Sequence, residues 1–269
     1  MSTEIIHSFG LQLWHVYLII LVAGILQGFI NTMAGSGTAV MYSVLSLFGM
    51  PVTMINGTVR PGILFQTGAS SIKYYLNKKL VVKKGLLLGI PIIIGSIVGA
   101  EMAVNINKDL FEKIVAIVLL LMLVLMFYNP KKWLEGQSSE KQNKTGLIQI
   151  FLFLGIGFYG GFIHVGVGIF LLSALVLNAG FNLVQANALK VFLVFLYAPV
   201  VLIIFLINGK VDLFVALFAI IGNTIGGLIG ANLVIKKGAG FVRVFLVIII
   251  LLFSFHLLGV WDYLFALLS

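Results

Sequence analysis

The feature that most constrains this chain of 269 residues is a succession of apolar runs long enough to cross a lipid bilayer. Hydrophobic residues make up 61% of it and charged residues 9%, whereas a soluble domain has roughly 25% charged residues. A membrane-spanning helix needs about 20 apolar residues. Long runs lie at residues 12–33, 59–76, 85–104, 110–128, 146–164, 184–207, 212–234 and 241–258, and shorter runs at 38–50 and 168–179. The sequence therefore predicts an all-α integral membrane protein with about ten transmembrane or half-membrane helices.

The two halves of the chain resemble each other. A hydrophilic stretch, residues 129–145, separates residues 1–128 from residues 146–269, and one constant shift along the chain aligns the halves without a gap. The matched pairs include Gly24 with Gly155, Gly35 with Gly166, Gly37 with Gly168, Asn56 with Asn187 and Gly95 with Gly226. Each half has five segments, an odd number, so the second copy enters the membrane from the opposite side, as in many secondary transporters. We predict two inverted five-helix repeats joined by a cytoplasmic linker at 129–145.

The basic residues are concentrated in three loops. Loops 77–84, 129–145 and 235–243 are rich in Lys and Arg, whereas the loops at Lys108 and Lys210 are poor in them. The positive-inside rule places the basic loops in the cytoplasm and both termini outside. The net charge of +9 then reflects how the protein is oriented in the membrane, and we expect no nucleic-acid partner. The count does not distinguish ten full crossings from an arrangement that includes two half-membrane hairpins.

Two glycine-rich turns interrupt the apolar runs. The first, in "NTMAGSGTAV", contains Gly35, Ser36, Gly37 and Thr38, and the second, in "FIHVGVGIF", contains Gly166 and Gly168. The run after the first turn, 38–50, would reach roughly 20 Å as a helix, less than the roughly 30 Å hydrocarbon core. We therefore expect both turns inside the membrane, where free N–H groups at a helix start attract anions. The alternative is that the glycines only permit close helix packing.

Each half also carries a cation near the start of a predicted helix. Asn56 and Arg60 follow the first turn, and Asn187 and Lys190 follow the second, with the two cations one residue out of register. Charges inside spanning segments indicate function by default, so we predict that these residues and the turns form an anion-binding site. The alternative is that both cations extend to an interface. His164 is a candidate proton-coupling group or a structural residue.

The chain resembles the TauE/SafE sulfite exporter family of bacterial membrane proteins. The resemblance is clearest in the glycine-rich turns and in "YYLNKKLVVKKGLLLGIPIIIGSIVGAEM" with its echo "INGKVDLFVALFAIIGNTIGGLIGANL". It implies a permease for sulfite, sulfonates or other sulfur-containing anions, in the bacterial cytoplasmic (inner) membrane.

The function that these patterns predict is secondary transport of a small sulfur-containing anion by alternating access around a midplane site. An anion channel lined by the same groups is the alternative. The sequence contains no nucleotide-binding loop of the form G-x-x-x-x-G-K-[ST] and no metal-binding motif H-E-x-x-H, and its four histidines are dispersed. We therefore expect no enzyme activity, no cofactor and no metal site. The expected partners are the small anionic substrate and the lipid bilayer, and a homodimer is left open.

Overall fold

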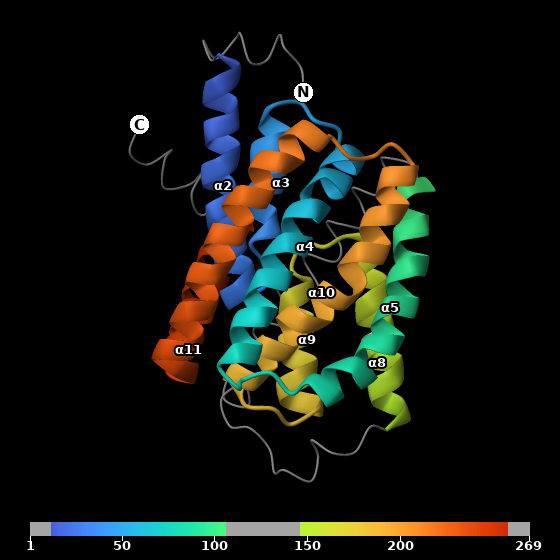
Figure 1. Ribbon diagram of the computed structural model, residues 1–269, viewed down its shortest axis with the longest axis vertical. Helices are drawn as coiled ribbons and strands as arrows, with labels where there is room; N and C mark the ends of the chain where they lie inside the picture. Colours follow the sequence, from blue (N-terminus) through green and yellow to red (C-terminus); the bar gives the residue numbers. More distant parts are fainter. Residues whose placement is uncertain (1–11, 106–145, 258–269) are drawn as a thin grey trace.

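The computed structural model describes residues 12–105 and 146–257, and this part of the chain is helical without strands (Figure 1). The first half contains α2 (Leu13–Met33), α3 (Thr38–Leu47), α4 (Val52–Leu76) and α5 (Val82–Asn105), and the second contains α8 (Leu147–Phe162), α9 (Val167–Ser173), the π-helix η2 (Ala174–Asn178), α10 (Leu183–Ile207) and α11 (Leu213–Leu257). In these ranges, α2, α5, α10 and residues 213–242 of α11 are long and apolar enough to cross a membrane. The prediction of an all-α, multi-pass membrane protein is confirmed at this level.

Two predicted elements lie outside the described residues: the segment 110–128 and the linker 129–145. The ten-helix inverted repeat depends on them and stays a prediction. The described helices nevertheless keep its spacing, because the shift that places Asn56 on Asn187 also places both ends of α4 on the ends of α10. In Figure 1, α2 and α4 run downward whereas α8 and α10 run upward.

Helices of one half of the chain pack against helices of the other half. The first helix of each half packs on the fourth helix of the other, so α2 lies against α11 and α8 against α5, and α4 lies beside α10. Small residues make this packing close, as is usual between membrane helices: a methyl group on Gly28 would collide with the backbone of Asn223, and one on Gly157 with that of Ile92.

These contacts correct the register of the first helix. Gly28 and Gly157 make equivalent contacts, and the shift that relates them also places the end of α2 at Met33 on the end of α8 at Phe162. Gly24 packs on α11, but no atom lies within contact distance of a methyl group built on Gly155, so the predicted pairing of these two glycines is wrong. Because α9 and η2 together are two residues longer than α3, the predicted shift is restored after η2.

The predicted start of α4 at residue 59 is also too late. The helix begins at Val52, and its first turns carry Asn56 and Thr58, which are both fully buried. A search for apolar runs excludes polar residues such as these, although neighbouring residues of the protein bury them here. The predicted runs 212–234 and 241–258 correspond to the two parts of α11, because the backbone at Gly238 is not helical (φ 73°, ψ −167°) and divides α11 into two helices there.

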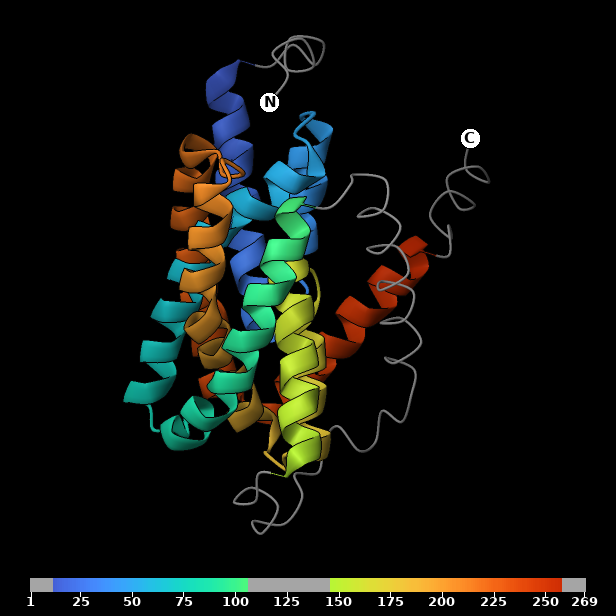
Figure 2. The same ribbon diagram turned by 90° about the vertical axis from the view of Figure 1, so that its right-hand side faces the viewer.

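Two helical hairpins enter the molecule from opposite ends and meet inside it (Figures 1 and 2). The first consists of α2 and α3, and the second of α8, α9 and η2. At the contact, Gly168 N donates a hydrogen bond of 3.2 Å to Gly35 O. Gly35 has a φ of +84°, and a methyl group on it would overlap the backbone of Gly168, so glycine is required by both conformation and space. The structure thus places the tips of both hairpins, with their glycine-rich turns, in contact inside the molecule.

Candidate functional site

Arg60 of α4 is 1% exposed and binds the carboxyl end of α8. Its Nη1 donates to Gly160 O at 2.7 Å, and its Nη2 donates to Gly161 O at 2.9 Å and to Asn56 Oδ1 at 2.8 Å. Its Nε donates to Asn56 O at 3.1 Å, and Asn56 Nδ2 donates to Phe162 O at 2.8 Å. The last carbonyl groups of a helix lack partners within it and carry partial negative charge. Arg60 and Asn56 therefore satisfy the end of α8 in the molecule's interior.

Lys190 of α10 makes the corresponding contacts with α2. It is 1% exposed, and its Nζ donates to Asn31 O at 3.0 Å and Thr32 O at 2.9 Å. The shift that relates α2 to α8 places Asn31 and Thr32 on Gly160 and Gly161, so the two cations hold equivalent backbone groups of opposite halves. An ammonium has three N–H donors, and Lys190 also lines a cavity. The carbonyl groups of Asn31 and Thr32 account for two of these three donors.

The helix starts at the two turns are partly occupied by protein groups. Thr38 N donates to Asn31 Oδ1 at 3.2 Å, and Asn31 Nδ2 donates to Thr38 Oγ1 at 3.1 Å. At the second turn, Gly168 N donates to Gly35 O. Ser36 Oγ is buried and has no hydrogen-bond partner. The N–H groups of Thr38 and Gly168 are thus engaged by the protein rather than free for an anion.

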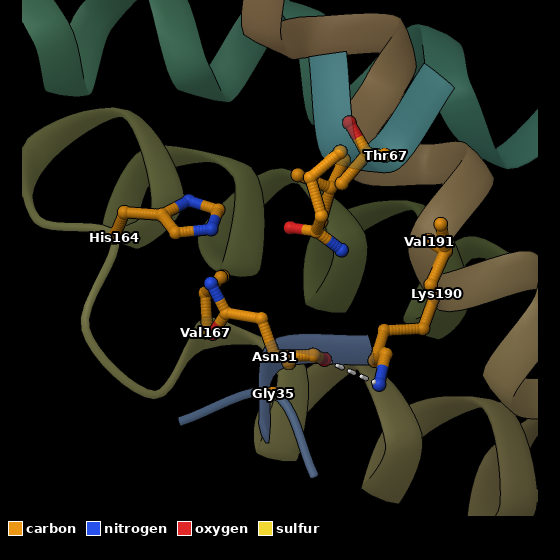
Figure 3. Close-up of a pocket in the computed structure, with 10 residues that line it drawn as sticks. Asn31, Gly35, Thr67, His164, Val167, Lys190 and Val191 are labelled. Carbon is orange, nitrogen blue, oxygen red and sulfur yellow. Dashed lines mark hydrogen bonds between the residues drawn. The ribbon is translucent and has the colours of Figure 1, made fainter. Parts of the chain in front are cut away.

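A small cavity lined by both polar and apolar residues lies between the hairpin tips and α4 and α10 (Figure 3). It has room for about one water molecule. Its lining consists of Asn31, Gly35, Gln66, Thr67, His164, Val167, Gly168, Lys190, Val191 and Val194. The structure therefore brings together the predicted site residues Gly35, Gly168, His164 and Lys190 around one cavity.

The other predicted site residues lie outside this lining. They are Ser36, Gly37, Thr38, Asn56, Arg60, Gly166 and Asn187. Gly37 packs on the backbone of α2, Gly166 precedes α9 with a φ of 73°, and Asn187 Nδ2 lies 3.5 Å from the hydroxyl of Tyr74. Sequence reasoning did not assign Asn31, Gln66 and Thr67 to the site, although polar side chains in apolar segments were the available signal.

His164 faces the cavity in Figure 3. Its Nδ1 and the hydroxyl of Tyr197 share a hydrogen bond of 2.8 Å, and the ring is 4% exposed. The histidine is thus held by a partner on α10 while its ring borders the space beside Lys190.

The fold and the site are typical of membrane transporters. Opposed helical hairpins meet inside the molecule, and broken helix ends and buried charges lie around a small cavity. Residues 20–257 match the family model described as "Sulfite exporter TauE/SafE", and the chain belongs to this family.

Curated relatives are named as transporters. The "Probable membrane transporter protein ORF9" of Sinorhizobium sp is 26% identical over 246 residues, which cover 91% of this chain and 94% of the relative. A "Probable membrane transporter protein" of Haemophilus influenzae is 27% identical, covering 86% and 89%, and YfcA of Escherichia coli K12, with the same description, is 28% identical, covering 87% and 86%. No solved structure matches the chain.

Proposed function

We propose that this protein is a secondary transporter that moves a small sulfur-containing anion, such as sulfite or an organosulfonate, across the bacterial cytoplasmic membrane. The observation that carries the proposal is the buried ammonium of Lys190 at the cavity, because a buried charge needs a partner. Among the described residues, the carboxylates are Glu101, which is exposed, and Asp212, whose Oδ1 accepts from Phe214 N and Val215 N. An anionic substrate would complete the charge balance of the cavity. The family description supports sulfite or a related oxyanion.

We assign five groups that line the cavity to the substrate: Lys190, His164, Gln66, Asn31 and Thr67. Lys190 would bind an oxyanion oxygen with its remaining N–H, while the side chains of Asn31, Gln66 and Thr67 offer further polar atoms at the same cavity. His164 is a candidate to carry a coupled proton. Arg60, Asn56 and the glycines of both turns would hold the hairpin ends that shape the site.

The opposed hairpins support transport by alternating access. The cavity has room for about one water molecule, so a sulfonate would enter only after a hairpin tip moves away. The contact between Gly35 and Gly168 would be one of the contacts that open. A cavity this small between two opposed hairpins supports a carrier rather than a continuously open channel, which is the alternative function.

The orientation of the protein in the membrane can be proposed from its charges. The α4–α5 loop, with Lys78, Lys79 and the adjacent Lys83, lies at the lower end of the molecule in Figure 1, whereas the α10–α11 loop, with Lys210, lies at the upper end. The positive-inside rule then places the lower end in the cytoplasm and both termini outside.

Flux measurements in proteoliposomes test the function. Wild-type protein should give saturable uptake of sulfite or a sulfonate above that of protein-free vesicles, and unlabelled anion inside the vesicles should accelerate this uptake. Acceleration from the opposite side is a property of a carrier, so its absence together with flux would identify a channel. Equal fluxes with and without protein, for every sulfur oxyanion tried, would refute the proposal.

A further inference from the structure

Between α2, α4 and α11 lie buried polar groups that have no hydrogen-bond partner in the protein. We use the term polar seam for Gln66 and Ser70 of α4 and Asn223 of α11. Gln66 Oε1, Ser70 Oγ and Asn223 Oδ1 have no hydrogen-bond partner, and each of these residues is at most 1% exposed. Leaving a polar group buried without a partner costs about 1–3 kcal/mol. Three such groups at one helix interface make it a candidate binding site.

The seam residues are neighbours in space. Asn223 Nδ2 lies beside Gly62, one turn before Gln66 on α4, while Gly227, one turn after Asn223 on α11, lies beside the side chains of Gln66 and Ser70. The three seam residues therefore lie on adjacent turns of the α4–α11 contact. A third buried amide, Gln27, has no partner at either side-chain atom and immediately precedes Gly28, which packs on Asn223.

The other half of the molecule shows that helix packing does not require these residues. At the positions that the shift between α4 and α10 relates, Ile92 stands in place of Asn223, Val201 in place of Ser70 and Tyr197 in place of Gln66. The two seam glycines also lack glycine counterparts, since Leu193 replaces Gly62 and Ser96 replaces Gly227. The α4–α11 contact thus carries polar side chains packed beside glycines, where the α5–α10 positions carry bulkier and mostly apolar side chains.

We propose that the polar seam binds Na⁺. Amide and hydroxyl oxygens are ligands of hard cations, and a divalent cation usually requires carboxylates, which the seam does not contain. None of the three side chains accepts a proton near neutral pH, so the seam is not a proton site. Transporters of this architecture use neutral oxygens near broken helices to bind coupling ions.

The Na⁺ site is linked to the cavity through Gln66. Its Nε2 donates to Thr32 Oγ1 at 2.7 Å, and the carbonyl of Thr32 accepts from Lys190. Gln66 also lines the cavity. Binding of Na⁺ at Gln66 Oε1 would fix this side chain and so favour the arrangement that holds Lys190 against α2. This coupling rests on the proposed function, whereas Na⁺ binding itself does not.

Thermal unfolding of the purified full-length protein in NaCl and in choline chloride at equal ionic strength tests the site. A ligand that binds the native state raises its stability, so NaCl should raise the Tm of the wild type by several degrees. Asn223→Ile and Ser70→Val, which insert the residues of the other half, should abolish the rise. Their Tm in choline chloride should equal or exceed that of the wild type, because an apolar pair replaces unsatisfied groups.

Thr224→Val is the matched control. Thr224 neighbours Asn223, but its Oγ1 donates to Ile220 O of its own helix at 2.7 Å, so this variant should keep the Na⁺ response. Equal Tm values of the wild type in the two salts would refute the site and indicate that the seam holds water only. Ser70→Ala gives the same test if the larger substitutions do not yield folded protein.

Flux measurements separate this proposal from the proposed function. Replacing Na⁺ by choline should lower anion uptake about tenfold, within the usual range of coupling between two sites. Anion uptake that is equal in both salts, with no Tm difference, would refute the Na⁺ site and leave the transporter. A Na⁺-dependent Tm without anion flux would refute the transporter and leave the site.

Discussion

The two hairpin ends pose the same structural problem, and the two halves solve it with different cations. α8 and α2 both end inside the molecule, where their last carbonyl groups need donors. Arg60 supplies them to Gly160 and Gly161, and Lys190 to Asn31 and Thr32. The repeat therefore keeps a crossed arrangement in which the buried cation of one half holds the broken helix of the other.

The two cations differ in how many hydrogen bonds each makes with the protein. Arg60 uses three nitrogen atoms in four hydrogen bonds, and its guanidinium also lies 5.2 Å from the ring centre of Phe205, a cation–π contact. Lys190 makes two hydrogen bonds and faces the cavity. From this comparison we propose that Arg60 belongs to the scaffold and that Lys190 binds the substrate.

The largest effect is expected for Arg60→Ala. The variant leaves the carbonyls of Gly160 and Gly161 and the side chain of Asn56 without their donor, and removing one partner from a buried charged network costs about 3–5 kcal/mol. We expect a strong fall in Tm and in the yield of monodisperse protein, measured by thermal unfolding and size-exclusion chromatography in detergent.

Lys79→Ala is the control for Arg60→Ala, because Lys79 is exposed in the α4–α5 loop. Arg60→Lys should restore only part of the Tm, since an ammonium cannot reproduce the planar fork of a guanidinium. A fully stable Arg60→Ala variant that has lost only transport would reverse the assignment of the two cations.

Lys190→Ala should lose transport more than stability. An anion that loses a buried, hydrogen-bonded charge partner loses about 2–5 kcal/mol of binding, so uptake at low substrate concentration should fall at least about 30-fold. The fall in stability should be smaller than for Arg60→Ala, because two hydrogen bonds are lost instead of four. Initial rates in proteoliposomes and Tm values of the same preparation give both quantities.

A Lys190→Ala variant that transports at the wild-type rate would exclude Lys190 as the substrate ligand. The same outcome, combined with a Tm as low as that of Arg60→Ala, would mean that both cations only support the helix ends. Lys210→Ala is a suitable control on the same half of the chain, since Lys210 lies in the loop before α11.

The helices and the positions of both cations could be predicted from sequence because they depend on hydropathy and on matched polar residues. The partners of the cations could not, because they are carbonyl groups about 100 and 160 residues away in the chain, and any residue type supplies a carbonyl. The same limit explains why Asn56 was assigned to the substrate, although it binds Phe162 O.

The cavity residues missed by sequence analysis have another explanation. Asn31, Gln66 and Thr67 correspond to Gly160, Tyr197 and Ala198 in the other half, so a search for matched residues could not find them. The repeat reveals what both halves need for folding, namely turns and helix-end donors. Residues that differ between the halves, such as Gln66 and Thr67, are where we propose to look for ligand contacts.

The smallest effect should separate the two repeat-related asparagines. Asn56 Nδ2 donates to Phe162 O at 2.8 Å and its Oδ1 accepts from Arg60, whereas Asn187 makes one long contact of 3.5 Å with Tyr74 and its Oδ1 has no partner. Asn56→Ala should lower the free energy of unfolding by about 2 kcal/mol, since it leaves buried groups unpaired. Asn187→Ala should lower it by less, because it removes one long contact and an oxygen that has no partner.

Paired Tm measurements of Asn56→Ala and Asn187→Ala, at the same detergent and salt concentrations, check this difference. Each variant is the other's matched control, because both remove the same amide from equivalent, fully buried positions of α4 and α10. If Asn187→Ala is as destabilising as Asn56→Ala, the α10 side also serves as a scaffold, and the division of roles between Arg60 and Lys190 fails. If Asn187→Ala is stable but transports poorly, its unpartnered Oδ1 belongs to the path of the substrate.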